Sequence, residues 1–166
     1  MLATLIILAV IILDQVTKYF AVTLLAPIRS YPIIDGVFEL HFVRNRGAAW
    51  GILADSRWIF MTISIISILL MLIYLFFSSY NHKLFTVSLS LIIGGGIGNM
   101  IDRLFYVDGA VVDFLYFKLI DFPVFNIADC AVTVGAGLLI FYLVYFEIIK
   151  PMKNGKDNTD GKADMQ

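Results

Sequence analysis

Two aspartates lie next to apolar residues at the edges of hydrophobic segments, where an ionised side chain is difficult to solvate. Asp113 lies in the run Gly-Ala-Val-Val-Asp-Phe at 109–114, and Asp129 lies in the run Phe-Asn-Ile-Ala-Asp at 125–129. A carboxylate loses solvation free energy in a low-dielectric environment, so its presence there indicates a function or a strong partner. Two carboxylates near one membrane surface can act as general acid and general base, which is our leading hypothesis for the chemistry.

Further polar residues inside hydrophobic segments could line such a site or support it. Asp14 and Lys18 are four residues apart and therefore share one face of a helix. This spacing fits a site role and a neutralised pair that only anchors helix packing equally well. Asn99, Asp102 and Arg103 end another apolar segment, where a structural role near the lipid headgroups is favoured over a direct one.

Asn126 and Asp129 also fit a simpler explanation. Asn is a good N-cap, an acidic residue three positions later completes a box-like cap, and a helix start favours an ionised carboxylate. Capping does not explain Asp113, which has no predicted helix to cap and whose apolar neighbours argue against free solvation. We expect four other loop aspartates to be solvated: Asp35, Asp55, Asp108 and Asp121.

The composition is that of a membrane protein. Of the 166 residues 60% are hydrophobic and 15% are charged, against about 45–50% and about 25% in soluble domains. The net charge of −1 gives no indication of nucleic-acid binding. One cysteine excludes an internal disulfide and a Cys-type zinc site, and the two histidines are too few for a His cluster. A metal site of Asp residues alone is conceivable, but the neighbouring Arg103 and Lys18 would oppose the cation, so we expect neither metal nor cofactor.

Four stretches reach the roughly 20 mostly apolar residues that a membrane span needs, and they lie at 2–25, 58–78, 84–105 and 125–149. They predict a membrane all-α bundle forming one domain, 1–149, followed by a polar, disordered cytoplasmic tail, 150–166. Four spans put both termini on one side, and the lysines of the tail favour the cytoplasm. All the candidate polar residues then fall near the outer surface.

The loop after the first span has a structure of its own. After the Asp35-Gly36 turn signal, the aromatic and aliphatic side chains of Phe38, Leu40 and Phe42 alternate with a second set, which is Val37, Glu39, His41 and Val43. This period of two residues predicts a strand. We expect a small sheet on the outer surface, a cradle formed by residues of about 28–56. The glycine run 94–98 has no preceding strand, so close helix packing is favoured over phosphate binding.

Five runs, in this order along the chain, resemble the motifs of the lipoprotein signal peptidases (signal peptidase II), which are bacterial membrane aspartyl peptidases. The runs are Asp14-Gln-Val-Thr-Lys18, Asn45-Arg-Gly-Ala-Ala-Trp50, Gly94-Gly-Gly-Ile-Gly-Asn-Met-Ile-Asp-Arg103, Val111-Val-Asp-Phe114 and Phe125-Asn-Ile-Ala-Asp129. Any one run would be weak support, but five in order are specific. Two departures are minor: Gly96 stands where Ala is expected, and Cys130 where Ser is common.

The resemblance implies a four-helix transmembrane bundle with an outer β-sheet cradle and an aspartate dyad of Asp113 and Asp129. It implies removal of the signal peptide from diacylglyceryl-modified prolipoproteins, by cleavage before the lipidated Cys, and inhibition by cyclic peptide antibiotics of the globomycin type. Other partners would be membrane lipids only, with the chain a monomer in the bacterial inner membrane. The supporting positions that it implies are Asp14, Lys18, Asn45, Gly47, Asn99, Asp102, Arg103 and Asn126.

Two rival interpretations come from other classes of protein. A small proton-coupled transporter would use intramembrane aspartates as a relay, but it predicts polar groups through the whole membrane depth and a repeat between halves. The inner halves of the spans hold almost only apolar or small residues, and no repeat is visible. A non-enzymatic assembly factor would use its acids for packing alone, so that replacing Asp113 would affect stability and not turnover.

Overall fold

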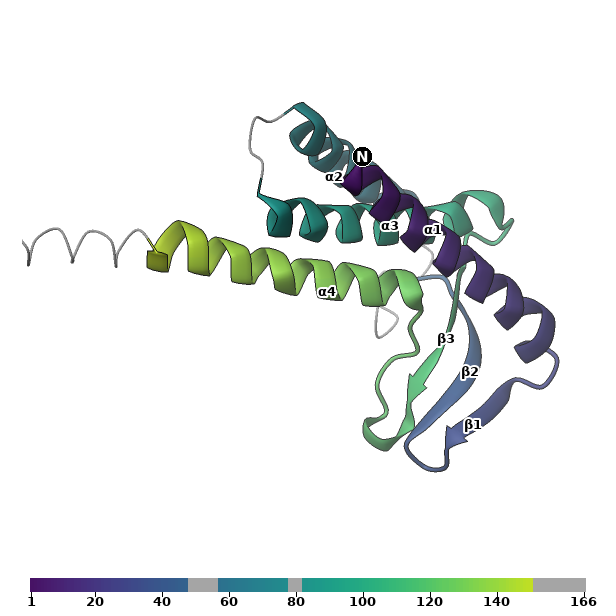
Figure 1. Cartoon of the computed structure of the whole chain (residues 1–166). Coiled ribbons are helices and arrows are strands. Elements are labelled where there is room, and N and C mark those ends of the chain that lie inside the picture. Colours follow the sequence, from purple (N-terminus) through teal and green to yellow (C-terminus); the bar gives the residue numbers. More distant parts are fainter. Residues whose placement is uncertain (48–56, 78–81, 151–166) are drawn as a thin grey trace, which may run out of the picture.

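The computed structural model describes residues 1–47, 57–77 and 82–150. The predicted tail beyond Lys150 and the 48–56 part of the predicted cradle lie outside these residues. Within these residues the fold has four long helices, a short 3-10 helix (Lys118–Ile120) and a small sheet (Figure 1). The helices are α1 (Leu2–Phe20, continued by the π-helical Ala21–Leu25), α2 (Arg57–Phe77), α3 (Lys83–Phe105) and α4 (Ile127–Tyr142, continued by the π-helical Leu143–Ile149).

The helices confirm the predicted membrane bundle. Three stretches of the described chain are long and apolar enough to cross a membrane: Leu2–Leu25, Lys83–Phe105 and Ile127–Phe146. The fourth helix, α2, contains the shorter apolar stretch Met61–Phe77. Exposed Leu, Ile and Phe side chains cover the outside of the bundle, as expected for a surface that faces lipid.

Helix α3 lies at the centre of the bundle and packs against the other three helices. Its glycines permit this, because a Cβ atom at Gly94 would lie 2.9 Å from Val10 Cβ in α1, and one at Gly95 would lie 2.4 Å from the Ala128 carbonyl oxygen in α4. Small residues that let helix backbones approach are typical of membrane bundles. The glycine run therefore serves helix packing, as the sequence predicted.

Gly95→Ala is expected to destabilise the protein by about 1–3 kcal/mol, the usual range for overpacking. The added methyl group would meet backbone of α4, which cannot move aside as a side chain can. Gly137→Ala is a matched control, because a Cβ atom at Gly137 has no neighbour within 4 Å. Thermal unfolding in detergent would measure both, and equal midpoints for the two variants would contradict the packing argument.

The sheet is antiparallel with the strand order β1 (Ser30–Ile34), β2 (Phe38–Asn45) and β3 (Val111–Phe117). It lies at the end of the bundle where α1 ends and α4 begins (Figure 1). A hydrophobic cluster of Ala21 and Leu25 with Val112 and Phe114 holds the sheet against the end of α1. Strand β2 confirms the strand predicted at 37–43.

Asp113 lies in the connection between α3 and α4, but in the middle of a strand, β3, which the sequence analysis did not predict. Strand β3 pairs with β2, with Val43 opposite Asp113 and Asn45 opposite Val111. This pairing satisfies the backbone polar groups of an apolar segment whose residues 111–114 are all buried. The hydrogen-bond partner comes from a distant part of the chain, so the local pattern alone did not reveal the strand.

Candidate active site

Asp113 is 2% exposed, and two side-chain amides hold its carboxylate. Asn45 Nδ2 donates to Asp113 Oδ2 at 2.9 Å, and Asn126 Nδ2 donates to Asp113 Oδ1 at 2.6 Å. Burial raises the pKa of Asp113 to about 7, with a further contribution from the charge of Asp129, although the two amide donors act to lower it. A carboxyl group with this pKa can hold or release a proton near neutral pH.

Register explains how Asn45 reaches Asp113. Val43 lies opposite Asp113 and Asn45 lies opposite Val111, so Asn45 and Asp113 are diagonal neighbours on one face of the sheet. Diagonal pairs on adjacent strands are within reach of polar side chains. Asn45 Oδ1 also accepts a hydrogen bond from the Gly47 backbone N–H at 3.0 Å, which fixes the orientation of the amide.

Asp129 lies in the first turn of α4 and is part of a capping box. The Asp129 N–H donates to Asn126 Oδ1 at 2.9 Å, and the Asn126 N–H donates to Asp129 Oδ2 at 3.1 Å. The capping explanation is therefore confirmed. The cap uses Oδ2 alone, whereas Oδ1 accepts a hydrogen bond from Asn99 Nδ2 at 2.7 Å and keeps a further lone pair. The same residue can cap α4 and present an oxygen to a ligand.

Asn126 links the two aspartates. The chain returns to β3 just before α4, where Phe125 and Leu115 exchange backbone hydrogen bonds of 2.8 and 3.0 Å. This places the fully buried Asn126 beside Asp113 at the start of the helix that carries Asp129. Asn126 Nδ2 also lies 3.0 Å from Asn99 Oδ1, which completes an amide connection from one carboxylate to the other.

A buried ion cluster supports this arrangement from behind. The ammonium group of Lys18 contacts Asp14 Oδ2 at 2.9 Å, Asp102 Oδ2 at 3.1 Å and Asn99 Oδ1 at 2.9 Å. Asp14 Oδ1 accepts from the Ala128 N–H and Asp102 Oδ2 accepts from the Val112 N–H, both at 2.9 Å. The cluster therefore fastens α1 to the start of α4, and α3 to β3.

One supporting residue was not predicted from the sequence. The side-chain amide of Gln15 donates to Asp14 Oδ2 at 3.1 Å and to Asp102 Oδ1 at 3.2 Å. Its position next to Asp14, in the first of the five runs, was the only available signal.

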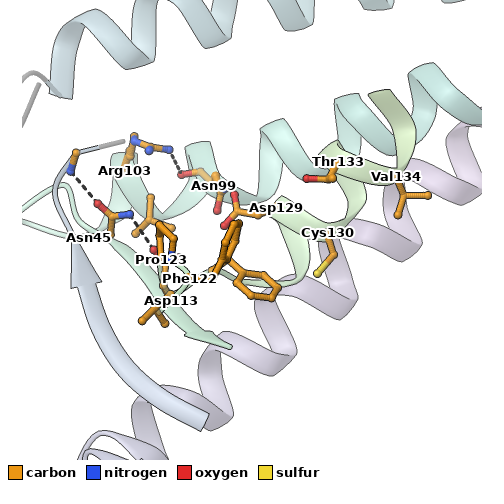
Figure 2. A pocket seen from close by; sticks show the side chains of 14 residues that line it. Asn45, Asn99, Arg103, Asp113, Phe122, Pro123, Asp129, Cys130, Thr133 and Val134 are labelled. Carbon is orange, nitrogen blue, oxygen red and sulfur yellow. Dashed lines mark hydrogen bonds between the residues drawn. The ribbon is translucent and has the colours of Figure 1, made fainter. Parts of the chain in front are cut away.

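A cavity of about 620 Å³ lies in front of the two carboxylates (Figure 2). Of the ten predicted site residues, six line it: Asn45, Gly47, Asn99, Arg103, Asp113 and Asp129. The other four, Asp14, Lys18, Asp102 and Asn126, are buried in the packing behind it. The remaining wall is largely apolar and comes from the start of β3, the segment before α4 and the first turns of α4: Val111, Phe122, Pro123, Val124, Phe125, Cys130, Thr133 and Val134.

Two of the loop aspartates expected to be solvated, Asp108 and Asp121, are exposed and also have protein partners. Arg44 donates to Asp108 Oδ1, and the Tyr116 hydroxyl donates to Asp121 Oδ1 at 2.5 Å. The Arg44 hydrogen bond lowers the pKa of Asp108. Asp35 is exposed, as expected, and Asp55 lies outside the described residues. Within the ranges that the structure describes, no group of three or more His, Cys, Asp or Glu side chains could hold a metal ion.

Comparisons with known proteins agree on one family. A family model described as signal peptidase (SPase) II matches residues 6–145. The lipoprotein signal peptidase of Symbiobacterium thermophilum is 43% identical over 149 residues, covering 89% of this chain and 97% of that protein. The lipoprotein signal peptidase of Halothermothrix orenii is 45% identical over 138 residues, covering 83% of this chain and 92% of that protein.

Solved structures agree with the sequence comparison. A bacterial membrane enzyme solved by the in meso method at 2.3 Å resolution is 36% identical, with a TM-score of 0.81 over 89% of this chain and 90% of that one. A second such enzyme, solved at 1.9 Å, is 37% identical with a TM-score of 0.76. With its apolar helices and a family match over most of its length, the chain belongs to the signal peptidase II family and is a membrane-embedded peptidase.

Proposed function

We propose that this peptidase removes the signal peptide from diacylglyceryl-modified prolipoproteins by cleaving before the lipidated Cys, with Asp113 and Asp129 as its catalytic residues. The observation that carries the proposal is the meeting of these two carboxylates, from a strand and a helix, at one largely apolar cavity. Asn126 holds both of them, through Asp113 Oδ1 and through the capping box of α4. The relatives' names supply the substrate class.

In the proposed mechanism the two carboxylates share one proton, because nearby like charges disfavour double ionisation. The pKa of about 7 favours Asp113 as the protonated member. Ionised Asp129, held by Asn99 and by the helix start, accepts a proton from water as the water oxygen attacks the scissile carbonyl. Asp113 donates a hydrogen bond to the oxyanion and then its proton to the leaving amine. No covalent intermediate forms.

The apolar wall of the cavity fits a lipidated substrate. Phe122 and Val134 are both exposed and border the cavity, so acyl chains and an apolar signal peptide could leave it toward lipid. Arg103, on the polar side, could orient the peptide. We place this end of the bundle at the outer leaflet of the inner membrane and both termini in the cytoplasm, with the chain active as a monomer.

The direct test is a synthetic precursor peptide with a diacylglyceryl-modified Cys, incubated with the purified protein and followed by mass spectrometry. The expected products are the free signal peptide and a fragment that begins at the lipidated Cys. A cyclic peptide of the globomycin type is expected to block the reaction. The matched control is the same peptide without the lipid, which should stay intact. Cleavage at another bond, or equal cleavage of both peptides, would refute the proposed specificity.

Asn45→Ala is expected to shift the basic limb of the kcat/KM pH profile to higher pH by about one pH unit. The Asn45 amide donates to Asp113 and stabilises its ionised form, so losing this donor raises the pKa of Asp113 above about 7. Asp113 then keeps its catalytic proton to higher pH. The magnitude follows from about 1.5 kcal/mol for a hydrogen bond to a charged group and about 1.4 kcal/mol per pKa unit. A downward or absent shift would contradict Asp113 as the proton donor.

A further inference from the structure

We propose that Arg44 and Asp108 form a clamp that holds Asn45 against Asp113, so that both are positioning residues for the cleavage reaction. The inference rests on the proposed function. It concerns residues that neither line the cavity nor belong to the buried ion cluster. Arg44 is 27% and Asp108 is 31% exposed, so the pair lies at the edge of the fold.

The clamp joins two segments that are far apart in the sequence. Arg44, in β2, donates to Asp108 Oδ1, and the same oxygen accepts from the Ala110 N–H at 3.3 Å. Asp108 lies in the turn between α3 and β3, which the Gly109 N–H closes by donating to the Tyr106 carbonyl at 2.9 Å. One carboxylate therefore ties the end of β2 to the residue that immediately precedes β3.

A second contact restricts the arginine of the clamp. The guanidinium carbon of Arg44 lies 3.9 Å from the centre of the Tyr106 ring, within the range of a cation–π interaction. Arg46 adds a weaker contact, 4.0 Å from Asp108 Oδ2. The two arginines that flank Asn45 in the sequence thus both approach one aspartate.

The geometry of a strand explains how the clamp acts on Asn45. Successive side chains of a strand point to opposite faces, so anchoring Arg44 on one face directs Asn45 to the other, where Asp113 lies. Asn45 is the last residue of β2, and strand ends open more readily than strand centres. The Arg44–Asp108 pair therefore restrains the end of β2 at Asn45, as pairing with a neighbouring strand restrains residues in the middle of a strand.

The charge of Asp108 persists under assay conditions. The hydrogen bond from Arg44 lowers the pKa of Asp108, so the carboxylate stays ionised at and above neutral pH. The other charged groups that act on Asp113 come from the helices: Asp129 from α4, Lys18 from α1 and Arg103 from α3. The described link between the clamp and Asp113 is Asn45, which follows Arg44 in β2 and donates to Asp113 Oδ2, so we expect a clamp variant to change the surroundings of Asp113 through Asn45.

The test is a double-mutant cycle on full-length protein with the lipidated precursor peptide. Asp108→Asn keeps the size of the side chain and removes its charge. It is expected to lower kcat about tenfold, because small displacements of a positioning group cost one to two orders of magnitude. It should also move the basic limb of the pH profile upward, as Asn45→Ala does. When Asp108→Asn is added to the Asn45→Ala variant, it should alter kcat less than about twofold and should not shift the basic limb of the pH profile further.

Two controls separate positioning from general damage. Asp35→Asn makes the same chemical change in the exposed turn before β2 and should leave kcat and the pH profile unchanged. The exchange Arg44→Asp with Asp108→Arg should recover part of the activity that either single change removes. Recovery of this kind requires the folded pair, so it also answers the objection that a single variant is merely less stable.

The clamp is refuted if Asp108→Asn leaves turnover and the pH profile unchanged, or if its effect is as large without Asn45 as with it. Failure of the proposed function is a distinct result. It would appear as turnover by Asp113→Asn in the same assay, whereas failure of the clamp alone leaves Asp113→Asn inactive.

Discussion

Asp113→Asn and Asp129→Asn are each expected to lower turnover of a lipidated precursor by about a thousandfold or more. General acid–base catalysis by one positioned group is worth about 10²–10⁴-fold, and each substitution removes the only proton carrier that its side chain offers. Asn keeps the shape of Asp and can still accept one hydrogen bond from the surrounding amides. Initial rates of purified variants, each measured separately, would provide the test.

Folding must be shown to survive in both variants. Asp129→Asn weakens the capping box, so its unfolding midpoint is expected to fall further than that of Asp113→Asn. Asp35→Asn, an exposed turn residue, is the matched control for the chemical change. Substantial turnover by either folded variant would remove the dyad mechanism. Loss of stability with turnover retained per folded molecule would favour a packing role.

Lys18→Met is expected to destabilise the protein by about 3–5 kcal/mol, the range seen when one partner of a buried ion pair is removed. Lys18 is 2% exposed and contacts two buried carboxylates, those of Asp14 and Asp102. Without the ammonium group both would lose their cation in surroundings that water does not reach. Thermal unfolding in detergent would measure the effect, with Lys83→Met at the exposed start of α3 as the control.

The Lys18→Met experiment also separates the two interpretations of Lys18 that the sequence left open, a direct role in the site and a packing role as the partner of Asp14. A packing role predicts that combining Lys18→Met with Asp14→Asn restores part of the stability, because one uncompensated charge is removed. A direct role in the site predicts a folded but inactive Lys18→Met protein. Normal stability together with lost turnover would therefore contradict the packing interpretation.

Much of the helical framework was predictable from the sequence. The four expected stretches agree with α1–α4 because long apolar runs and breakers such as Pro27 and Asp35-Gly36 are local signals. The capping box at Asn126 and Asp129 was predictable for the same reason. Strand β2 followed from alternation, whereas β3 reads as one apolar run that pairs with a strand more than sixty residues earlier.

The sequence pattern did not predict contacts between residues that are far apart in the chain. Asp108 has the same local setting as other loop aspartates, and only the approach of β2 brings Arg44 to it. Gln15 looks like an ordinary polar residue in α1, yet it joins the buried cluster because α3 presents Asp102 to it. Such contacts depend on which helix faces meet.

The sequence by itself determined that this is a membrane protein, where its helices run, and which polar side chains gather at one end of the bundle. Hydrophobicity and helix breakers act within about twenty residues, so these features can be found without a fold. Only the tertiary structure decided that Asp113 sits on a strand, that Asn126 joins it to the capped Asp129, and that Lys18 joins the two buried carboxylates behind them, Asp14 and Asp102. Hydrogen bonds and ion pairs act over a few ångströms, and the chain must be folded before residues so far apart in the sequence come that close.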